Sequence, residues 1–369
     1  MAVSDPMARQ FLLVALNLRS DQVHSTIVRL GRREVASGRQ VALNLTVALV
    51  SVALLLLAGG REVLGQQRTR QTKGWDFTEK IQCQGNVRTF IVHIPPSYNP
   101  TTPIPVVLVF HGAYMNGQMM LYVTGFNKVA DRHKFVVLYP DGLGGRWEDG
   151  RFAHAGGDIE FVSDMLNQLS RRVKIDQRRI YAAGLSNGGY FVQKLACETN
   201  RIAAIAVVAS ALAVQTANAC QNSRAVPVMF FVGSADPLVP SNDPDHNAEL
   251  GKIGEALGIG SLGSLSPSIA QMGGMMTSEE AVAFWCHHNH CSLSPYTKQL
   301  PDLDPRDGTR VKCETYGGYG SEVVLYKIEG GGHNWPGAVY FGPKEYFGNL
   351  THDIDASELI ADFFLHHSN

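Results

Sequence analysis

The chain has little net charge and lacks the usual signals of nucleotide and nucleic-acid chemistry. Its 32 lysines and arginines almost balance 33 aspartates and glutamates, which gives a formal net charge of −1. No basic stripe interleaved with aromatic residues is present, so nucleic acid is not expected as a partner. No glycine-rich loop carrying a lysine follows a predicted strand, and no repeat of solenoid period occurs, so nucleotide chemistry and a repeat architecture are not expected either.

Cysteine is also scarce, and its placement is informative. The six cysteines are Cys83, Cys197, Cys220, Cys286, Cys291 and Cys313. All follow residue 76, and an even number in an oxidising compartment is typical of disulfides. The sequence alone does not select the pairs. The favoured pair is Cys197–Cys220, which would tie a helix to the loop before the next strand, followed by Cys291–Cys313. Buried free thiols are the alternative.

One long apolar run is present. Residues 41–58 contain no charged side chain and follow Arg32, Arg33 and Arg39. As a helix this run would be roughly 27 Å long, close to a bilayer core of about 30 Å. It is interpreted either as the core of a signal peptide or as an N-terminal membrane anchor. The basic flank favours a cytoplasmic N-terminus and an exported remainder, so a secreted or periplasmic location is expected.

The chain is long enough for one large domain. It has 369 residues, of which 45% are hydrophobic, which is sufficient for a substantial core. We assign residues 1–60 to the N-terminal region with its signal or anchor, 61–75 to a linker, and 76–369 to the catalytic domain. Residues 241–277 interrupt the pattern of that domain and are interpreted as a lid or pocket wall, with a surface loop as the alternative.

Strands and helices alternate through this domain. Apolar or alternating runs predict strands near residues 88–94, 105–110, 135–139, 179–183, 204–209, 226–232 and 322–328. Helical patterns fall at residues 158–173, 187–199, 278–288 and 355–366. Such alternation predicts a mostly parallel central sheet with helices on both faces.

The most informative motif is G-x-S-x-G at residues 184–188. A β-prone run at 180–183 leads into Gly184, and a helix-compatible run begins just after the motif. This is the strand–turn–helix context of a nucleophile elbow, in which Ser186 is strained and exposed. Gly184 and Gly188 would be needed because a Cβ at either position would clash with neighbouring backbone. Ser186 is therefore the candidate nucleophile.

A serine hydroxyl needs a base and an acid to become nucleophilic. The apolar strand at 226–232 is followed closely by Asp236, and an acid past a strand end is expected in the order Ser, Asp, His. Asp243 and Asp245 are weaker candidates because neither directly follows a strand. A later strand at 323–328 leads through three glycines to His333, which is the candidate base.

The oxyanion of the tetrahedral intermediate needs two backbone N–H donors. The residue after the nucleophile, Asn187, is expected to supply one. The other is expected from Ala113, in the turn that follows the apolar strand at 106–110. His111, in the same turn, is interpreted as structural.

Neither a metal nor a cofactor is expected. The one segment rich in histidine and cysteine, CHHNHC at 286–291, has a spacing that fits no common zinc site, and a surface loop is favoured there. The site is therefore predicted to be free of metal, and the absence of a cofactor is implied by the family resemblance described next.

Six stretches resemble the secreted polyhydroxybutyrate depolymerase-like and feruloyl esterase-like family of α/β-hydrolases. They are VVLVFHGAYMNG (106–117), YPDGLGGRWEDGR (139–151), YAAGLSNGGYFVQKLAC (181–197), VGSADPLVP (232–240), AVAFWCHHNHC (281–291) and IEGGGHNWPG (328–337). GLSNGG together with GGGHNWPG is the most specific part of the resemblance. Two stretches depart from the family pattern: Asp158 and Glu160 are separated rather than consecutive, and residues 250–276 are rich in Gly, Ser and Met.

The resemblance implies an α/β-hydrolase fold, a Ser186, Asp236 and His333 triad, and ester hydrolysis without a cofactor. It also implies that Trp335 lies beside the base and Trp147 near the site entrance. These two residues and Tyr114 are expected to contact substrate.

The predicted function is that of an exported serine carboxylesterase acting through an acyl-enzyme. Two substrates are close rivals: feruloyl-type aryl esters on plant polysaccharide, and short hydroxyalkanoate esters. The two departures from the family pattern bear on this preference and leave the chemistry unchanged. A non-catalytic binding or adhesion protein of the same fold, or a serine peptidase, is the alternative function.

Overall fold

The computed structural model describes residues 75–151, 157–239, 274–318 and 321–369. Within these ranges one ten-stranded sheet has the order β1-β2-β4-β3-β5-β6-β7-β10-β9-β8. Its strands are β1 (Trp75–Cys83), β2 (Asn86–Ile94), β3 (Ile104–Phe110), β4 (Val136–Pro140), β5 (Ile175–Leu185), β6 (Ala204–Val208), β7 (Val228–Gly233), β8 (Tyr296–Gln299), β9 (Arg310–Tyr316) and β10 (Val323–Glu329).

The centre of the sheet is parallel and its edges are antiparallel. Strands β4, β3, β5, β6, β7 and β10 run in one direction, whereas β1 and β2 on one side and β9 and β8 on the other pair antiparallel. All seven side chains of β3 are buried, as expected for a parallel strand covered on both faces. The prediction of a mostly parallel α/β-hydrolase sheet is confirmed, and β5 lies at its centre.

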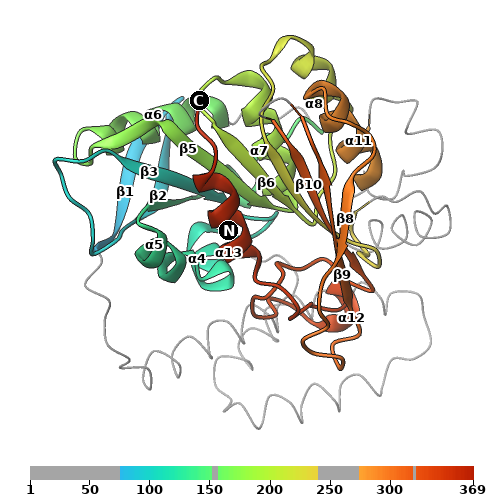
Figure 1. Cartoon of the computed structure of the whole chain (residues 1–369). Helices are drawn as coiled ribbons and strands as arrows, with labels where there is room; N and C mark the ends of the chain where they lie inside the picture. Colours follow the sequence, from blue (N-terminus) through green and yellow to red (C-terminus); the bar gives the residue numbers. More distant parts are fainter. Residues whose placement is uncertain (1–74, 152–156, 240–273, 319–320) are drawn as a thin grey trace, which may run out of the picture. The chain divides into compact units, whose positions relative to one another are not determined.

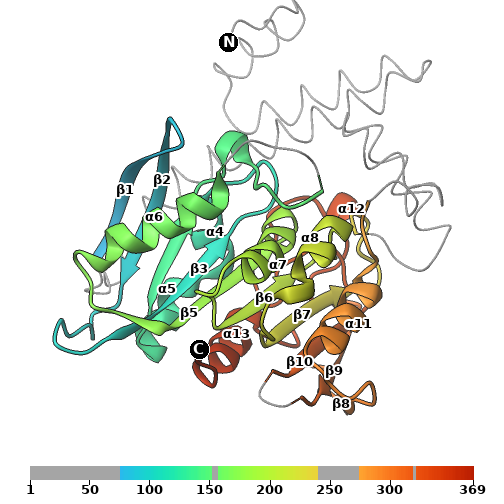
Figure 2. The same ribbon diagram turned by 90° about the horizontal axis from the view of Figure 1, so that it is seen from above.

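Helices cover both faces of this sheet (Figure 1; Figure 2). The helices are α4 (Gly117–Thr124), α5 (Phe126–His133), α6 (Asp158–Ser170), α7 (Asn187–Glu198), α8 (Val214–Ala219), α11 (Ser278–His288), α12 (Lys344–Phe347) and α13 (Ala356–Leu365), with short 3-10 turns at Leu143–Gly145 and Cys220–Asn222. One face packs against α6, α7 and α11, through side chains such as Phe161, Phe191 and Trp285. The other face packs against α4, α5 and α13, through side chains such as Met120, Phe126 and Ile360.

The cysteine predictions are partly right. Cys197 and Cys220 form a disulfide, which ties the end of α7 to the turn after α8. The pairing of Cys291 with Cys313 is wrong, since both are free thiols, as are Cys83 and Cys286. The Cys291 Sγ instead donates to the Ser321 carbonyl at 3.3 Å, whereas Cys313 lies on β9 opposite Tyr326 of β10.

Several predictions concern residues outside the described ranges. These are the apolar run at 41–58, the alternative acids Asp243 and Asp245, and most of the predicted lid at 241–277. Among the described residues, no helix combines the length and the hydrophobicity needed to cross a bilayer.

The β1–β2 edge contains a buried histidine between two carboxylates. The Nδ1 of His93 lies 2.6 Å from Asp76 and its Nε2 lies 3.0 Å from Asp131. A carboxylate only accepts hydrogen bonds, so both ring nitrogens donate and the imidazolium is favoured. Although burial lowers the pKa of His93, the two carboxylates outweigh it and the net shift is upward.

This histidine makes stability depend on pH. Because the folded pKa of His93 is raised, its contribution to stability is complete below the unfolded value of about 6.5 and is lost as pH rises through the folded value. We expect His93→Gln to lower the urea midpoint more at about pH 6 than at about pH 9. Equilibrium unfolding at both pH values measures this. A difference between the two proteins that does not change with pH would contradict the assignment.

Candidate active site

Ser186 occupies a strained turn between β5 and α7. Its backbone has φ 54° and ψ −118°, a conformation that L-residues rarely adopt and that functional sites often retain. A Cβ on Gly184 would lie 2.2 Å from the Gly188 carbonyl oxygen, and one on Gly188 would lie 2.4 Å from the Phe110 carbonyl oxygen. The expected need for both glycines is confirmed. The half-buried Ser186 is held with its side chain at the sheet's carboxyl edge.

Asp236 and His333 form a buried pair. The Nδ1 of His333 lies 2.9 and 3.0 Å from the two carboxylate oxygens of Asp236. Since the carboxylate accepts, Nδ1 carries the proton, and Nε2 is the ring nitrogen that can accept another. Asp236 is itself held by the Leu238 N–H, which donates to its Oδ1 at 2.8 Å.

The fold brings these side chains to one edge of the sheet. Ser186 follows β5, Asp236 follows β7 and His333 follows β10, and all three strands run parallel with β6 between β5 and β7. The glycine before the base is required for close packing of the backbone. A Cβ on Gly332 would lie 2.1 Å from the Phe347 carbonyl oxygen. The close approach lets the backbone N–H of His333 donate to that same oxygen at 2.6 Å.

The turn that contains one expected oxyanion donor lies against the elbow that contains the other. A Cβ added to Gly112 would lie 3.5 Å from the Cβ of Ser186, so the turn that contains Ala113 packs against the elbow. Within the described parts of the chain, neither the Ala113 nor the Asn187 backbone N–H donates to a protein acceptor. Both N–H groups therefore remain available to a ligand, and Asn187 adds the positive end of the α7 dipole.

His111 is structural, as interpreted from the sequence. Its Nδ1 donates to the Gly112 carbonyl at 2.7 Å, and its Nε2 accepts from the Gly142 N–H at 2.8 Å. Burial lowers the pKa of His111. The neutral ring therefore links two turns, and both of its nitrogens already have hydrogen-bond partners.

The two tryptophans that were expected to contact substrate are buried. Trp147 is 3% exposed, stacks on Phe191 and donates from Nε1 to the His111 carbonyl at 2.9 Å. Trp335 is 1% exposed and donates to the Ser357 hydroxyl at 3.0 Å. Their expected substrate contacts are therefore not supported, because both indoles face the core. A tryptophan close to a site in sequence can pack its indole in the hydrophobic core instead of contacting a ligand.

Tyr114 remains exposed. Its side chain is 65% accessible, and the Arg146 guanidinium lies 4.4 Å from its ring centroid and donates to its hydroxyl. This ring is adjacent in sequence to Ala113. Of the three residues expected to contact substrate, only Tyr114 is accessible to one.

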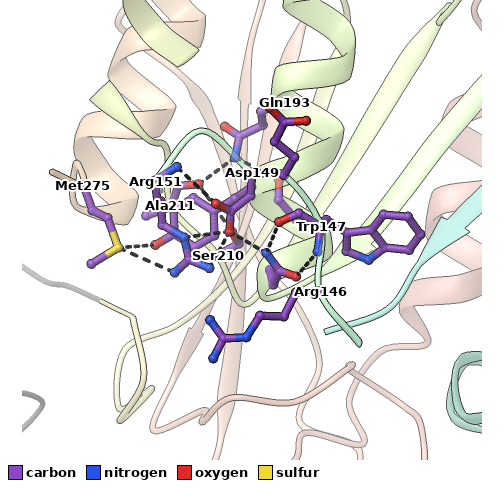
Figure 3. Close-up of polar contacts among 12 residues, drawn as sticks. Arg146, Trp147, Asp149, Arg151, Gln193, Ser210, Ala211 and Met275 are labelled. Atoms are coloured by element: carbon purple, nitrogen blue, oxygen red, sulfur yellow. Dashed lines mark hydrogen bonds and ion pairs between the residues drawn. The ribbon is translucent and has the colours of Figure 1, made fainter. Parts of the chain in front are cut away.

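Sequence reasoning missed a polar network behind the elbow (Figure 3). Asp149 and Arg151 form a buried ion pair, with the Arg151 guanidinium 4.0 Å from the centroid of the Tyr190 ring. The Met275 sulfur lies 3.7 Å from Arg151 and 3.4 Å from the Tyr190 hydroxyl. Burial raises the pKa of Tyr190 to about 12, so its hydroxyl is neutral. The only feature of the sequence that could have indicated this network is the i, i+2 spacing of Asp149 and Arg151 in a loop.

Asp158, one of the departures from the family pattern, holds the loop that contains Asp149. It pairs with Arg88 at 2.6 Å and accepts from the Glu148 N–H at 2.7 Å. The carboxylate therefore joins β2, the loop before α6 and α6 itself.

Among the described residues, no group of three or more His, Cys, Asp or Glu side chains is arranged to hold a metal ion.

Residues 89–243 match the family model described as esterase PHB depolymerase. This stretch is similar to polyhydroxybutyrate depolymerase-like and feruloyl esterase-like enzymes, and the chain is a carboxylic ester hydrolase. The match begins within β2 and ends after β7, so it includes the elbow and Asp236, whereas His333 lies beyond it.

Three curated relatives illustrate the range of the family. A putative esterase, NocK, of Nocardia uniformis subsp. tsuyamanensis is 26% identical over 301 residues, covering 78% of this chain and 81% of its own. Feruloyl esterase B of Piromyces equi is 25% identical over 255 residues, covering 67% and 42%. Poly(3-hydroxybutyrate) depolymerase of Ralstonia pickettii is 30% identical over 120 residues, covering 28% and 25%. The chain thus spans less than half the length of the last two.

Proposed function

We propose that the chain is a serine carboxylesterase in which Ser186 attacks the ester carbonyl and His333 accepts its proton. Asp236 orients His333 and stabilises the imidazolium, and the Asn187 and Ala113 N–H groups hold the oxyanion. His333 then protonates the leaving alcohol, and water repeats the cycle to release the acid. The observation that carries this proposal is the buried Asp236–His333 pair at the same sheet edge as the strained Ser186.

The proposed substrates are feruloyl-type aryl esters or short hydroxyalkanoate esters. Support comes from relatives named feruloyl esterase and poly(3-hydroxybutyrate) depolymerase. The exposed Tyr114 beside Ala113 offers an aromatic face of the kind that an aryl acyl group or a sugar ring packs against. We also propose that the enzyme is exported, since the Cys197–Cys220 disulfide is typical of an oxidising compartment.

One set of assays distinguishes the proposed esterase from two alternative functions. A binding or adhesion protein of this fold would hydrolyse nothing, and a serine peptidase would cleave peptide anilides. We expect turnover of short p-nitrophenyl esters, with kcat/KM on the order of 10⁴ M⁻¹s⁻¹ or above, and no release of p-nitroaniline from peptide anilides. Faster cleavage of anilides than of esters, or no turnover of either, would contradict the proposal.

The same assay format ranks the substrates. Methyl ferulate, acetylated xylan and 3-hydroxybutyrate oligomers would be compared by kcat/KM under one set of conditions, with Ser186→Ala as the blank. Methyl ferulate or the oligomers should be cleaved most efficiently. If acetylated xylan were preferred over both, the proposed acyl group would be wrong while the ester chemistry would stand.

A further inference from the structure

Asn187 has two separate roles available to it. Its backbone N–H begins α7, directly after Ser186, whereas its side chain is buried and faces the loop before α6. There the Oδ1 accepts from the Trp147 N–H at 2.8 Å, and the Nδ2 donates to the Trp147 carbonyl at 3.2 Å. The Nδ2 also donates to the Asp149 carboxylate. The side-chain amide is therefore clamped on both of its polar atoms.

Asp149 is a buried anion whose charge is compensated locally. It is 3% exposed and accepts from the Arg151 Nε at 2.8 Å and the Arg151 backbone N–H at 3.1 Å. Figure 3 shows this carboxylate beside the Arg151 side chain. A buried carboxylate persists only with such partners. It therefore provides a fixed, charged acceptor for the Asn187 amide, which makes that hydrogen bond stronger than a neutral one.

The same loop also holds the other oxyanion donor. We call residues 142–149 the brace. Its Gly145 carbonyl accepts from the Tyr114 N–H at 2.7 Å, one residue after Ala113. Its Trp147 indole donates to the His111 carbonyl at 2.9 Å, two residues before Ala113. The brace is thus hydrogen-bonded to both sides of the Ala113 turn and to the side chain of Asn187.

We propose that Asp149 is a positioning residue for the oxyanion hole, acting through the Asn187 side chain and the brace to fix the spacing of the Asn187 and Ala113 N–H groups. This inference rests on the proposed function, since it assigns Asp149 a role in that reaction. The two N–H donors stabilise charge that develops only in the transition state. A displacement of about 1 Å at such a site costs about 100-fold in rate. Loosening the brace should therefore lower kcat and leave KM nearly unchanged.

The test uses two variants and a matched control in the full-length protein. Asn187→Ala removes the clamped amide but keeps the backbone donor, and Asp149→Asn keeps the shape but removes the charge. Gln193→Ala is the control, because Gln193 is another buried amide of α7, which donates to the Ala211 carbonyl at 2.6 Å and accepts from the Trp285 indole at 2.9 Å. Its side chain also donates to the Gly189 carbonyl at 3.1 Å, and none of these three hydrogen bonds reaches the brace or Ser186.

Both brace variants should lose about 10- to 100-fold in kcat per folded molecule, with KM within about threefold of the wild type. Inhibition by a trifluoromethyl ketone, which forms an oxyanion on the serine, should weaken by a similar factor. Gln193→Ala should lower the melting temperature but keep kcat and the inhibition constant within about twofold. If Asn187→Ala does not fold, Asp149→Asn still decides the question, because it preserves volume.

The inference is overturned if Asp149→Asn keeps kcat and ketone affinity within about twofold of the wild type while its melting temperature falls as in Gln193→Ala. That result would make the brace purely structural. It would leave the proposed function intact, because the proposed function is tested separately by Ser186→Ala. Activity retained in Ser186→Ala would instead refute the triad itself.

Discussion

Replacing Ser186 by alanine is expected to lower kcat for ester hydrolysis by about 10⁴- to 10⁶-fold. The substitution removes the atom that forms the acyl-enzyme, and no neighbouring hydroxyl occupies the same strained position between β5 and α7. The oxyanion donors remain, so a small residual rate above that of water is expected. Initial rates with a p-nitrophenyl ester, at equal concentrations of folded protein, measure the loss.

The fold should tolerate this change. Ser186 has positive φ, which strains alanine no more than serine, so the melting temperature should remain close to that of the wild type. Ser170→Ala is a matched control, since this serine ends α6, donates to the Leu166 carbonyl of its own helix and accepts only a long hydrogen bond, at 3.4 Å, from the Gln177 side chain. Equal rates for Ser186→Ala and wild type would show that another nucleophile does the chemistry.

Replacing Asp236 by asparagine is expected to lower kcat by about 10⁴-fold. The Asp236 carboxylate accepts from His333 Nδ1 at 2.9 Å, which leaves Nε2 as the acceptor for the serine proton. An asparagine amide can donate to Nδ1 instead and so stabilise the opposite tautomer, in which Nε2 carries the proton. The base would then be present in the correct place but unable to accept from Ser186. The kcat of the variant on the same ester measures this loss.

The geometry around this residue should survive the substitution. An asparagine Oδ1 can still accept the Leu238 N–H that now donates to Asp236. Asp304→Asn, on the surface loop before β9, provides the control for loss of a carboxylate elsewhere in the domain. A fall in kcat of less than about tenfold would mean that Asp236 does not set the tautomer of the base.

Much of this arrangement follows from local sequence. The parallel strands were predictable because both faces of each are covered, which requires continuous apolar runs such as IPVVLVF in β3. The elbow was predictable because only glycine fits the close backbone approaches at positions 184 and 188. The strand β8 was not predicted, since all four of its residues are exposed and no alternating pattern marks it. Strands β1 and β9 were not predicted either, and of β1 only Trp75 lies in the segment assigned to the linker.

The features of the site that the sequence did not reveal have a different origin. Neighbouring residues in sequence can point in opposite directions, so the position of Trp335 two residues after His333 did not reveal that its indole packs in the core. The partners of the Asn187 side chain lie about 40 positions away in the chain, at Trp147 and Asp149. Only the folded backbone brings that loop against the elbow. Local patterns identify candidate nucleophiles and acids, whereas the groups that position them depend on tertiary contacts.

Covalent labelling tests the central claim most directly. A fluorophosphonate reacts with a serine only when a base and an oxyanion hole activate it, so intact-protein mass spectrometry should show a single adduct on the wild type. Peptide mapping should locate that adduct at Ser186. The same treatment should leave Ser186→Ala unlabelled and label Asp236→Asn far more slowly. An adduct at another residue, or labelling that persists in Ser186→Ala, would contradict the account.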